Sequence, residues 1–240
     1  MLRTRSSRIG LVACGLIALM TGLAGAAGET VTTTVKVPKT SAIKKKTPGQ
    51  SKVSWAMDIK KPDGSRAANL ATADLTLPKA VFADANGFKA CDMAKLQSSD
   101  DKSCPPKSVV GSATADIYSS PIREQPYPST GVIYYVGGKG KTVKLAVFYT
   151  LTEIPTVHSV TPVTVTRGSS TSKIHMDQPK LPTAPGLPDA TPLDISWTFD
   201  GKGAKGLLFR QAKPCKKGTM VPARSSFYDG SSTSATAKAC

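Results

Sequence analysis

The sequence predicts an all-β fold, and three observations support this class. Apolar residues recur at every second position in several short runs, which is the period of a strand with one buried face. Eighteen prolines are spread along the chain, and proline interrupts long helices. Turn signals such as Pro62-Asp63-Gly64 and Asp229-Gly230 separate the runs. The pattern indicates many short strands joined by turns.

Each of these runs, taken in chain order, predicts one strand of a sheet. The alternation is clearest at 53–59 and 193–199, and Gly137-Gly138-Lys139-Gly140 predicts a hairpin between two further runs. One short helix is expected near residues 92–97. We therefore expect an antiparallel β-sandwich, immunoglobulin-like or jelly-roll-like. The alternating or apolar runs lie at residues 31–37, 53–59, 75–77, 109–117, 132–136, 143–151, 163–165 and 193–199.

The amino terminus has the pattern of a secretory signal peptide. Three arginines precede an uncharged, mostly apolar run at 9–23, and Ala24-Gly25-Ala26 offers a small-residue cleavage site. We expect residues 1–26 to be removed from a secreted or cell-wall-associated protein. Two alternatives stay open. The uncharged run approaches the ~20 residues of a membrane-spanning anchor, and the residues before Cys14 resemble a lipobox.

The remaining chain is long enough for one large β domain. Residues 27–51 are expected to form an N-terminal strand and a basic loop, and residues 52–240 a single β-sandwich-type domain. The stretch 167–190 is rich in proline and glycine, so we expect a long loop there. A division into two domains would fall within the same stretch.

Four cysteines remain after cleavage, and an even number in an exported chain predicts disulfides. Three connectivities exist, and the spacing favours Cys91–Cys104 and Cys215–Cys240. Zinc ligation is disfavoured, because no Cys-x-x-Cys pair occurs and neither histidine lies near a cysteine in sequence. We expect no metal and no cofactor.

The charge balance is strongly basic. The leader holds three of the 32 basic residues and none of the 16 acids, so the mature chain carries a formal charge of +13. Lysine dominates, which suits diffuse attraction to polyanions better than specific nucleic-acid recognition. Lys44, Lys45 and Lys46 are the candidate contacts for an anionic envelope polymer, although a short charge run is more often a solvated loop.

No motif predicts catalysis. The segment Gly138–Thr142 lacks the first glycine of a P-loop, because Tyr135 stands there, and a strand pattern follows it instead of a helix. There is no Gly-x-Ser-x-Gly elbow. His158 and His175 have no catalytic signature beside them. A facing pair of carboxylates, as a glycosidase needs, is not recognisable from sequence.

The aromatic residues divide into two groups. Trp55 and Trp197 fall in phase with apolar neighbours, so we expect both in the core. Tyr127, Tyr134 and Tyr135 are the better candidates for surface aromatics.

Several segments of the chain match a known pattern, and they are Pro62-Asp63-Gly64-Ser65-Arg66, Leu75-Thr76-Leu77-Pro78-Lys79, Cys91, Cys104-Pro105, Ser108-Val109-Val110-Gly111-Ser112-Ala113, Cys215, Phe227-Tyr228-Asp229-Gly230-Ser231 and Cys240. Together these segments resemble a family of exported proteins of high-GC Gram-positive bacteria. The resemblance implies paired disulfides and a β-sandwich-like fold, and it implies no activity or catalytic residues.

These observations lead to a hypothesis of a non-enzymatic binding or structural module that is secreted or attached to the cell envelope. Its partner is expected to be an anionic envelope polymer or a protein. Two alternatives are an extracellular hydrolase acting on envelope polysaccharide and a polyanion-binding protein. Converging carboxylates in a groove would favour the hydrolase, and clustered lysines would favour the polyanion binder.

Overall fold

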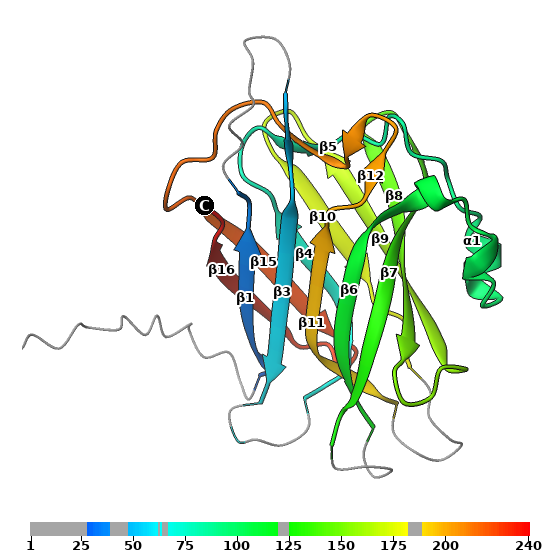
Figure 1. Ribbon diagram of the computed structural model, residues 1–240. Coiled ribbons are helices and arrows are strands. Elements are labelled where there is room, and N and C mark those ends of the chain that lie inside the picture. Colours follow the sequence, from blue (N-terminus) through cyan, green and yellow to red (C-terminus); the bar gives the residue numbers. More distant parts are fainter. Residues whose placement is uncertain (1–27, 39–47, 62, 64–66, 120–124, 182–188) are drawn as a thin grey trace, which may run out of the picture.

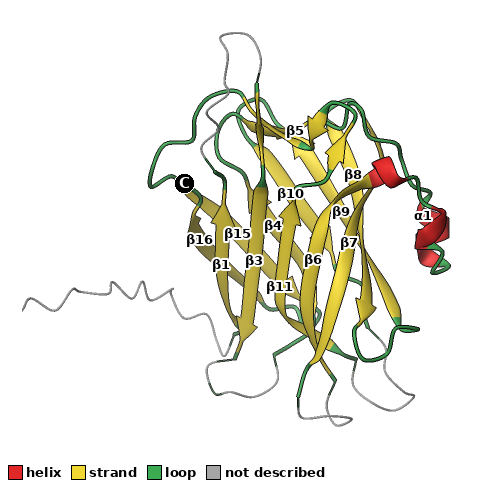
Figure 2. Ribbon diagram, viewed as in Figure 1, coloured by secondary structure: helices red, strands yellow, loops and turns green. Residues whose placement is uncertain are grey.

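The computed structural model describes residues 28–38, 48–61, 63, 67–119, 125–181 and 189–240 (Figure 1). Strands dominate this part of the chain (Figure 2), so the all-β prediction is confirmed. The one α-helix described, α1 (Met93–Gln97), lies where a short helix was expected. No helix among the described residues has both the length and the apolar character needed to cross a membrane.

Eleven strands form the main sheet, and all of its hydrogen-bonded neighbours run antiparallel. In spatial order they are β1 (Thr30–Lys36), β3 (Val53–Lys60), β11 (Thr191–Phe199), β6 (Val109–Tyr118), β7 (Tyr127–Lys139), β8 (Thr142–Leu151), β9 (His158–Arg167), β10 (Ser172–Asp177), β4 (Leu70–Thr76), β15 (Met220–Phe227) and β16 (Ser232–Lys238).

The sheet curls until its two edge strands, β1 and β16, lie side by side (Figure 1). Direction alternates across eleven antiparallel strands, so the first and the last run the same way and meet as a parallel pair. At one end of this seam the backbone N–H of Val37 donates to the carbonyl of Ala239 at 2.9 Å. At the other end Glu29 and Ser231 are hydrogen bonded. The sheet is therefore nearly closed around its core.

Every second side chain along β3 and β11 points into the core. Trp55 and Trp197 stand opposite each other in the register, and their rings meet edge to face with centroids 5.3 Å apart. Both side chains are buried, as predicted. The indole N–H of Trp197 donates to the hydroxyl of Tyr149 at 2.6 Å, which satisfies a donor that burial would otherwise leave unpaired.

Short strands cover one end of the curled sheet. Two small sheets lie there, and they bring Phe209 against Phe199 with ring centroids 5.1 Å apart. Both phenylalanines are fully buried, so these strands extend the core. The strands are β2 (Gly49–Ser51), β14 (Phe209–Gln211) and β5 (Val81–Ala83) in one sheet, and β12 (Lys202–Gly203) and β13 (Gly206–Leu207) in the other.

The segment 91–108 covers the outer face of β7, β8 and β9. It contains α1 and two 3₁₀ turns, Asp101–Ser103 and Pro106–Ser108, and the Cys91–Cys104 disulfide closes it with Cα atoms 5.0 Å apart. Beneath it lies a second apolar cluster that includes Tyr134 and Phe148. This cover explains why β7 and β8 carry apolar residues on both faces.

A second disulfide, Cys215–Cys240, joins the last residue to the connection before β15, with Cα atoms 6.0 Å apart. The two cysteine pairs are those that the spacing favoured. Disulfides persist in oxidising compartments, so they indicate a location outside the cytoplasm.

The stretch 167–190 differs from the expected loop. It contains β10, which pairs with β9 on one side and β4 on the other. The alternation of Ser172, Ile174 and Met176 as buried residues is too short and too polar to stand out beside the prolines that follow. The strands before and after this stretch, β9 and β11, therefore belong to the same sheet.

Candidate binding surfaces

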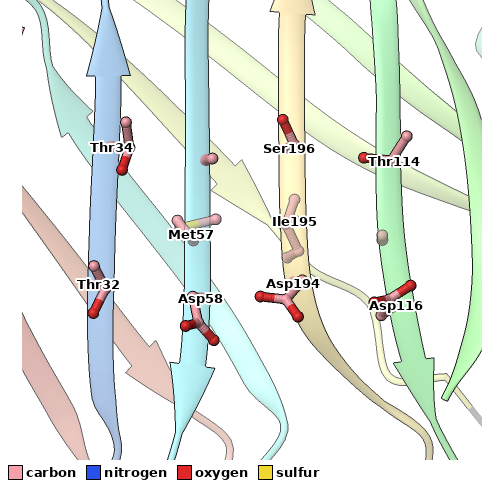
Figure 3. A pocket seen from close by; sticks show the side chains of 11 residues that line it. Thr32, Thr34, Met57, Asp58, Thr114, Asp116, Asp194, Ile195 and Ser196 are labelled. Atoms are coloured by element: carbon pink, nitrogen blue, oxygen red, sulfur yellow. The ribbon is translucent and has the colours of Figure 1, made fainter. Parts of the chain in front are cut away.

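A shallow groove of about 360 Å³ crosses the outer face of β1, β3, β11 and β6 (Figure 3). Its floor is the sheet itself, and its side chains are those that alternate away from the core. They are short and mostly polar: Thr32, Thr34, Ala56, Asp58, Thr114, Asp116, Asp194 and Ser196. The same alternation that buries Trp55 and Trp197 therefore lines this groove with hydroxyls and carboxylates.

Three aspartates from three neighbouring strands meet at one end of the groove (Figure 3). Asp58 and Asp194 stand directly opposite each other in the β3–β11 register. Lys60 donates to Oδ2 of Asp58 at 2.6 Å, whereas Oδ1 of Asp58 is buried and has no basic partner among the described residues. The carboxyl of Asp58 thus lies beside that of Asp194 on the neighbouring strand.

Asp194 has a pKa above its ordinary value. Partial burial is the largest cause, and the neighbouring Asp58 adds to it through its charge and a side-chain hydrogen bond. Asp116 raises the pKa further, and Lys60 opposes the shift. Two ionised carboxylates repel each other, so the neighbouring Asp58 favours the protonated form of Asp194.

His175 lies on the outer face of β10 and is held by two carboxylates. Nδ1 is 2.7 Å from Asp74, and Nε2 is 3.1 Å from Asp177. Partial burial opposes the charged ring, but the bonds and charges of Asp74 and Asp177 outweigh it and raise the pKa. Both ring nitrogens are occupied, so neither is available to activate a serine hydroxyl as in a catalytic triad.

His158 opens β9 and is half-buried. Its ring stacks on Phe148 at 4.9 Å between centroids, and the hydroxyl of Thr150 lies 3.1 Å from Nδ1. The residue lines a second hollow of about 280 Å³, together with Leu96 of α1 and Lys180. No carboxylate is hydrogen bonded to this histidine within the described ranges, so its surroundings differ from those of His175.

The charged side chains separate toward the two ends of the curled sheet. Strands alternate in direction, so each connection lies at one end or the other (Figure 1). Leaving aside the disulfide-closed part 91–104, which lies on the side of the sheet, the end with β5 and β12 carries thirteen lysines and two arginines among the described residues, against the acids Asp84 and Asp200. We call this surface the basic end: Lys36, Lys52, Lys79, Lys89, Lys107, Lys139, Lys141, Arg167, Lys202, Lys205, Arg210, Lys213, Lys216, Lys217 and Lys238.

The opposite end is acidic. It carries nine acids within the described ranges and only three basic residues, Lys60, Lys61 and Lys180. The three aspartates of the groove in Figure 3 lie toward this end of the sheet. The acids of this acidic end are Glu29, Asp58, Asp63, Asp116, Glu153, Asp177, Asp189, Asp194 and Asp229.

The structure places the remaining sequence candidates in different settings. Lys44, Lys45 and Lys46 lie outside the described residues. Tyr134 is buried beneath the segment 91–108, so its interpretation as a surface aromatic is wrong. Its hydroxyl donates to Asp101 at 3.3 Å, and burial raises its pKa to about 12. Tyr127 and Tyr135 are half-buried.

Sequence reasoning missed the groove. Asp58, Asp116 and Asp194 come from distant parts of the chain, and only the order β3-β11-β6 makes them neighbours. The sequence pattern that could have found them is an aspartate at an outward-facing position in each of three alternating runs. Among the described residues, no group of three or more His, Cys, Asp or Glu side chains is placed to hold a metal ion.

Comparison of the chain with models of known protein families, with curated proteins and with solved structures finds no match.

Proposed function

We propose that this chain is an exported, non-enzymatic binding module that holds a hydroxyl-rich polymer, such as an envelope polysaccharide, in the groove of β1, β3, β11 and β6. The observation that carries the proposal is the lining of the groove by short hydroxyl and carboxylate side chains on a rigid sheet. The signal-like amino terminus and the two disulfides support a location in the envelope or outside the cell.

The chemistry of the lining suits a sugar chain. Serine and threonine hydroxyls both donate and accept hydrogen bonds, and carboxylates accept them, so each ligand hydroxyl finds a complementary group. Ser196 stands at the centre, opposite Ala56 on one side and Thr114 on the other. Side chains set on neighbouring strands are held at fixed spacing, and a site on strands is more rigid than one on loops.

A groove-filling substitution tests the proposal. Ser196→Leu places a bulky apolar side chain at the centre and removes a hydroxyl, so retention on purified cell-wall polysaccharide should fall by about tenfold or more, equivalent to at least ~1.4 kcal/mol. Retention of the unchanged protein should persist at high salt, because hydrogen bonds in a shaped site are screened less than exposed charges. Co-sedimentation at low and high salt measures both.

The matched control is Ser234→Leu. Ser234 is an exposed serine on the outer face of β16 and lies outside the groove lining. This variant should bind as the unchanged protein does. Equal losses in the two variants, or retention that disappears at high salt, would contradict a polysaccharide site in the groove.

A hydrolase remains the second candidate, and the raised pKa of Asp194 is the observation that favours it. Carboxyls with separated pKa values are a pattern of acid–base catalysis. However, Asp58 and Asp194 lie side by side on one open face of the sheet, whereas glycosidase carboxyls flank the sugar bond from opposite sides. Release of reducing ends from the same polysaccharide, abolished by Asp194→Asn, would establish the hydrolase instead.

A further inference from the structure

We propose that the basic end is a docking surface for a linear polyanion, meaning a chain with negative charge on each repeating unit. This surface is distinct from the groove and lies at the other end of the curled sheet. The inference rests on the gathering of thirteen lysines at one end of the described structure, and on what surrounds them.

The lysines of the basic end have few charged partners within the described part of the protein. Within the described ranges only Lys52 among them forms an ion pair, with Asp200 at 2.9 Å. All thirteen lysine side chains are exposed. Two acids cannot neutralise so many cations, so this end holds a positive potential that attracts counter-ions and releases them when a polyanion binds.

Both arginines of the basic end have contacts within the protein. The guanidinium of Arg167 lies over the ring of Phe82, 3.8 Å from its centroid. Arg210 donates to the carbonyl of Lys205 at 2.6 Å and lies 3.7 Å from Asp84. Arginine recognises a single phosphate by a two-pronged contact, whereas lysine acts as a mobile point charge. The surface therefore suits a flexible charged chain better than one fixed phosphate.

The shape of the basic end also indicates a polymer. Nine of its thirteen lysines come from the β7–β8 turn, the β12–β13 hairpin, the segment 212–219 and the ends of the two seam strands. Neither of the two hollows described above lies here. A small anion would contact only one or two of these lysines, whereas an extended chain can reach several loops together.

Two other polyanionic partners fit less well. Single-stranded nucleic acid usually stacks its bases on exposed aromatic rings, but Arg167 covers Phe82, and Phe209 is buried. A membrane surface usually receives inserted apolar side chains. Of the exposed large hydrophobic residues in the described structure, only Met220 lies at this end.

The test compares two triple variants that remove the same charge from different places. Lys139, Lys202 and Lys216, all changed to Gln, weaken the basic end. Lys95, Lys102 and Lys144, also changed to Gln, lose equal charge from the segment 91–108 and from the side of β8. All six lysines are exposed, so folding should be retained and circular dichroism checks it. The probe is long-chain inorganic polyphosphate, titrated against the purified oxidised chain at several salt concentrations.

The unchanged protein should bind polyphosphate with an affinity that falls steeply with salt. The basic-end variant should bind about tenfold or more weakly, and its log–log salt slope should be shallower by about two to three. The control variant should change the affinity by no more than about twofold. Equal weakening by the two variants would overturn the proposal, because net charge alone would then explain the binding.

Two further titrations test the choice of partner. Single-stranded DNA of equal total charge should bind no more tightly than polyphosphate, and tighter binding would assign the surface to nucleic acid. Vesicles with anionic lipid should compete weakly, and binding to vesicles without binding to polyphosphate would assign it to a membrane. Ser196→Leu should bind polyphosphate normally, so failure of this proposal and failure of the groove proposal are distinguishable.

Discussion

The hydroxyl of Ser231 donates to the carboxylate of Glu29 at 3.0 Å, although the two residues are 202 positions apart in the chain. The other oxygen of Glu29 accepts the backbone N–H of Ala68 at 2.8 Å. Glu29 is only 4% exposed, so a charged group is buried at the seam and its two oxygens are satisfied there. This carboxylate connects the start of β1, the turn before β16 and the approach to β4.

Glu29→Ala should destabilise the protein by about 1–3 kcal/mol, because the partly buried N–H of Ala68 loses its acceptor. Urea unfolding measured by circular dichroism gives the change in free energy. Ser231→Ala removes one partner and leaves the Ala68 bond, so its cost should be smaller. A larger cost for Ser231→Ala than for Glu29→Ala would contradict the central position of the carboxylate.

Tyr149→Phe should destabilise the core by about 1–3 kcal/mol, since the buried indole N–H of Trp197 loses its acceptor. Burial also raises the pKa of Tyr149, so its hydroxyl stays neutral at ordinary pH. Tyr228→Phe serves as the comparison, because Tyr228 is 45% exposed and donates to the carbonyl of Gln178. Urea unfolding should show the smaller loss there, and equal losses would argue against the buried pair.

Asp194→Asn should stabilise the protein at neutral pH and have little effect in acid. The pKa of Asp194 is raised in the folded state, so its favourable contribution is present below the unfolded pKa, near 4, and is lost as pH rises through the folded value. The amide removes the repulsion by Asp58 at every pH. Unfolding free energies measured between about pH 3 and 7 should therefore diverge from those of the unchanged protein as pH rises.

Asp229→Asn should change the stability at neutral pH in the direction opposite to Asp194→Asn. The hydroxyl of Ser231, which Asp229 shares with Glu29, and the backbone N–H of Ser231 hydrogen bond to Asp229 and lower its pKa. Its contribution is therefore present above the unfolded pKa and is lost as pH falls through the folded value. This variant should be less stable than the unchanged protein at neutral pH, with the difference disappearing in acid. If both variants changed the unfolding free energy at neutral pH in the same direction, the opposite pKa shifts of the two carboxyls would be contradicted.

His175 should titrate above the ordinary histidine value of about 6.5 in an NMR titration of its ring protons. Its charged form faces Asp74 and Asp177, with Lys173 and Arg224 beside Asp74. The raised pKa means that its contribution to stability is complete below about 6.5 and is lost as pH rises through the folded value. Asp74→Asn should shift the titration midpoint downward, and an unchanged midpoint would rule out the pairing.

Sequence patterns located the strands but could not predict which strands lie side by side in the sheet. Alternation located β3 and β11 and placed Trp55 and Trp197 in the core, because period and burial are local properties of a strand. The spatial order β1-β3-β11-β6 is set by long-range pairing. Without that order, the three aspartates of the groove are single residues in separate runs.

The same limit applies to Tyr134 and to the charged ends. Tyr134 is out of phase with the buried residues of β7, so it looks exposed until the segment 91–108 is seen to cover it. Net charge is visible in composition, but its separation into a basic and an acidic end depends on which connections lie together. Only the alternating directions of the strands determine that grouping.

The parallel seam has a consequence for the time course of folding. A chain that emerges amino end first exposes the free edge of β1 long before the last strand, β16, is available to cover it. Closure depends on contacts between the two extremes of the sequence, and such long-range pairing is slow. An uncovered strand edge is also a template for pairing between chains. The form of this protein most prone to aggregate is therefore a chain in which β1 has formed and β16 is not yet available, and truncation within β16 should favour aggregation.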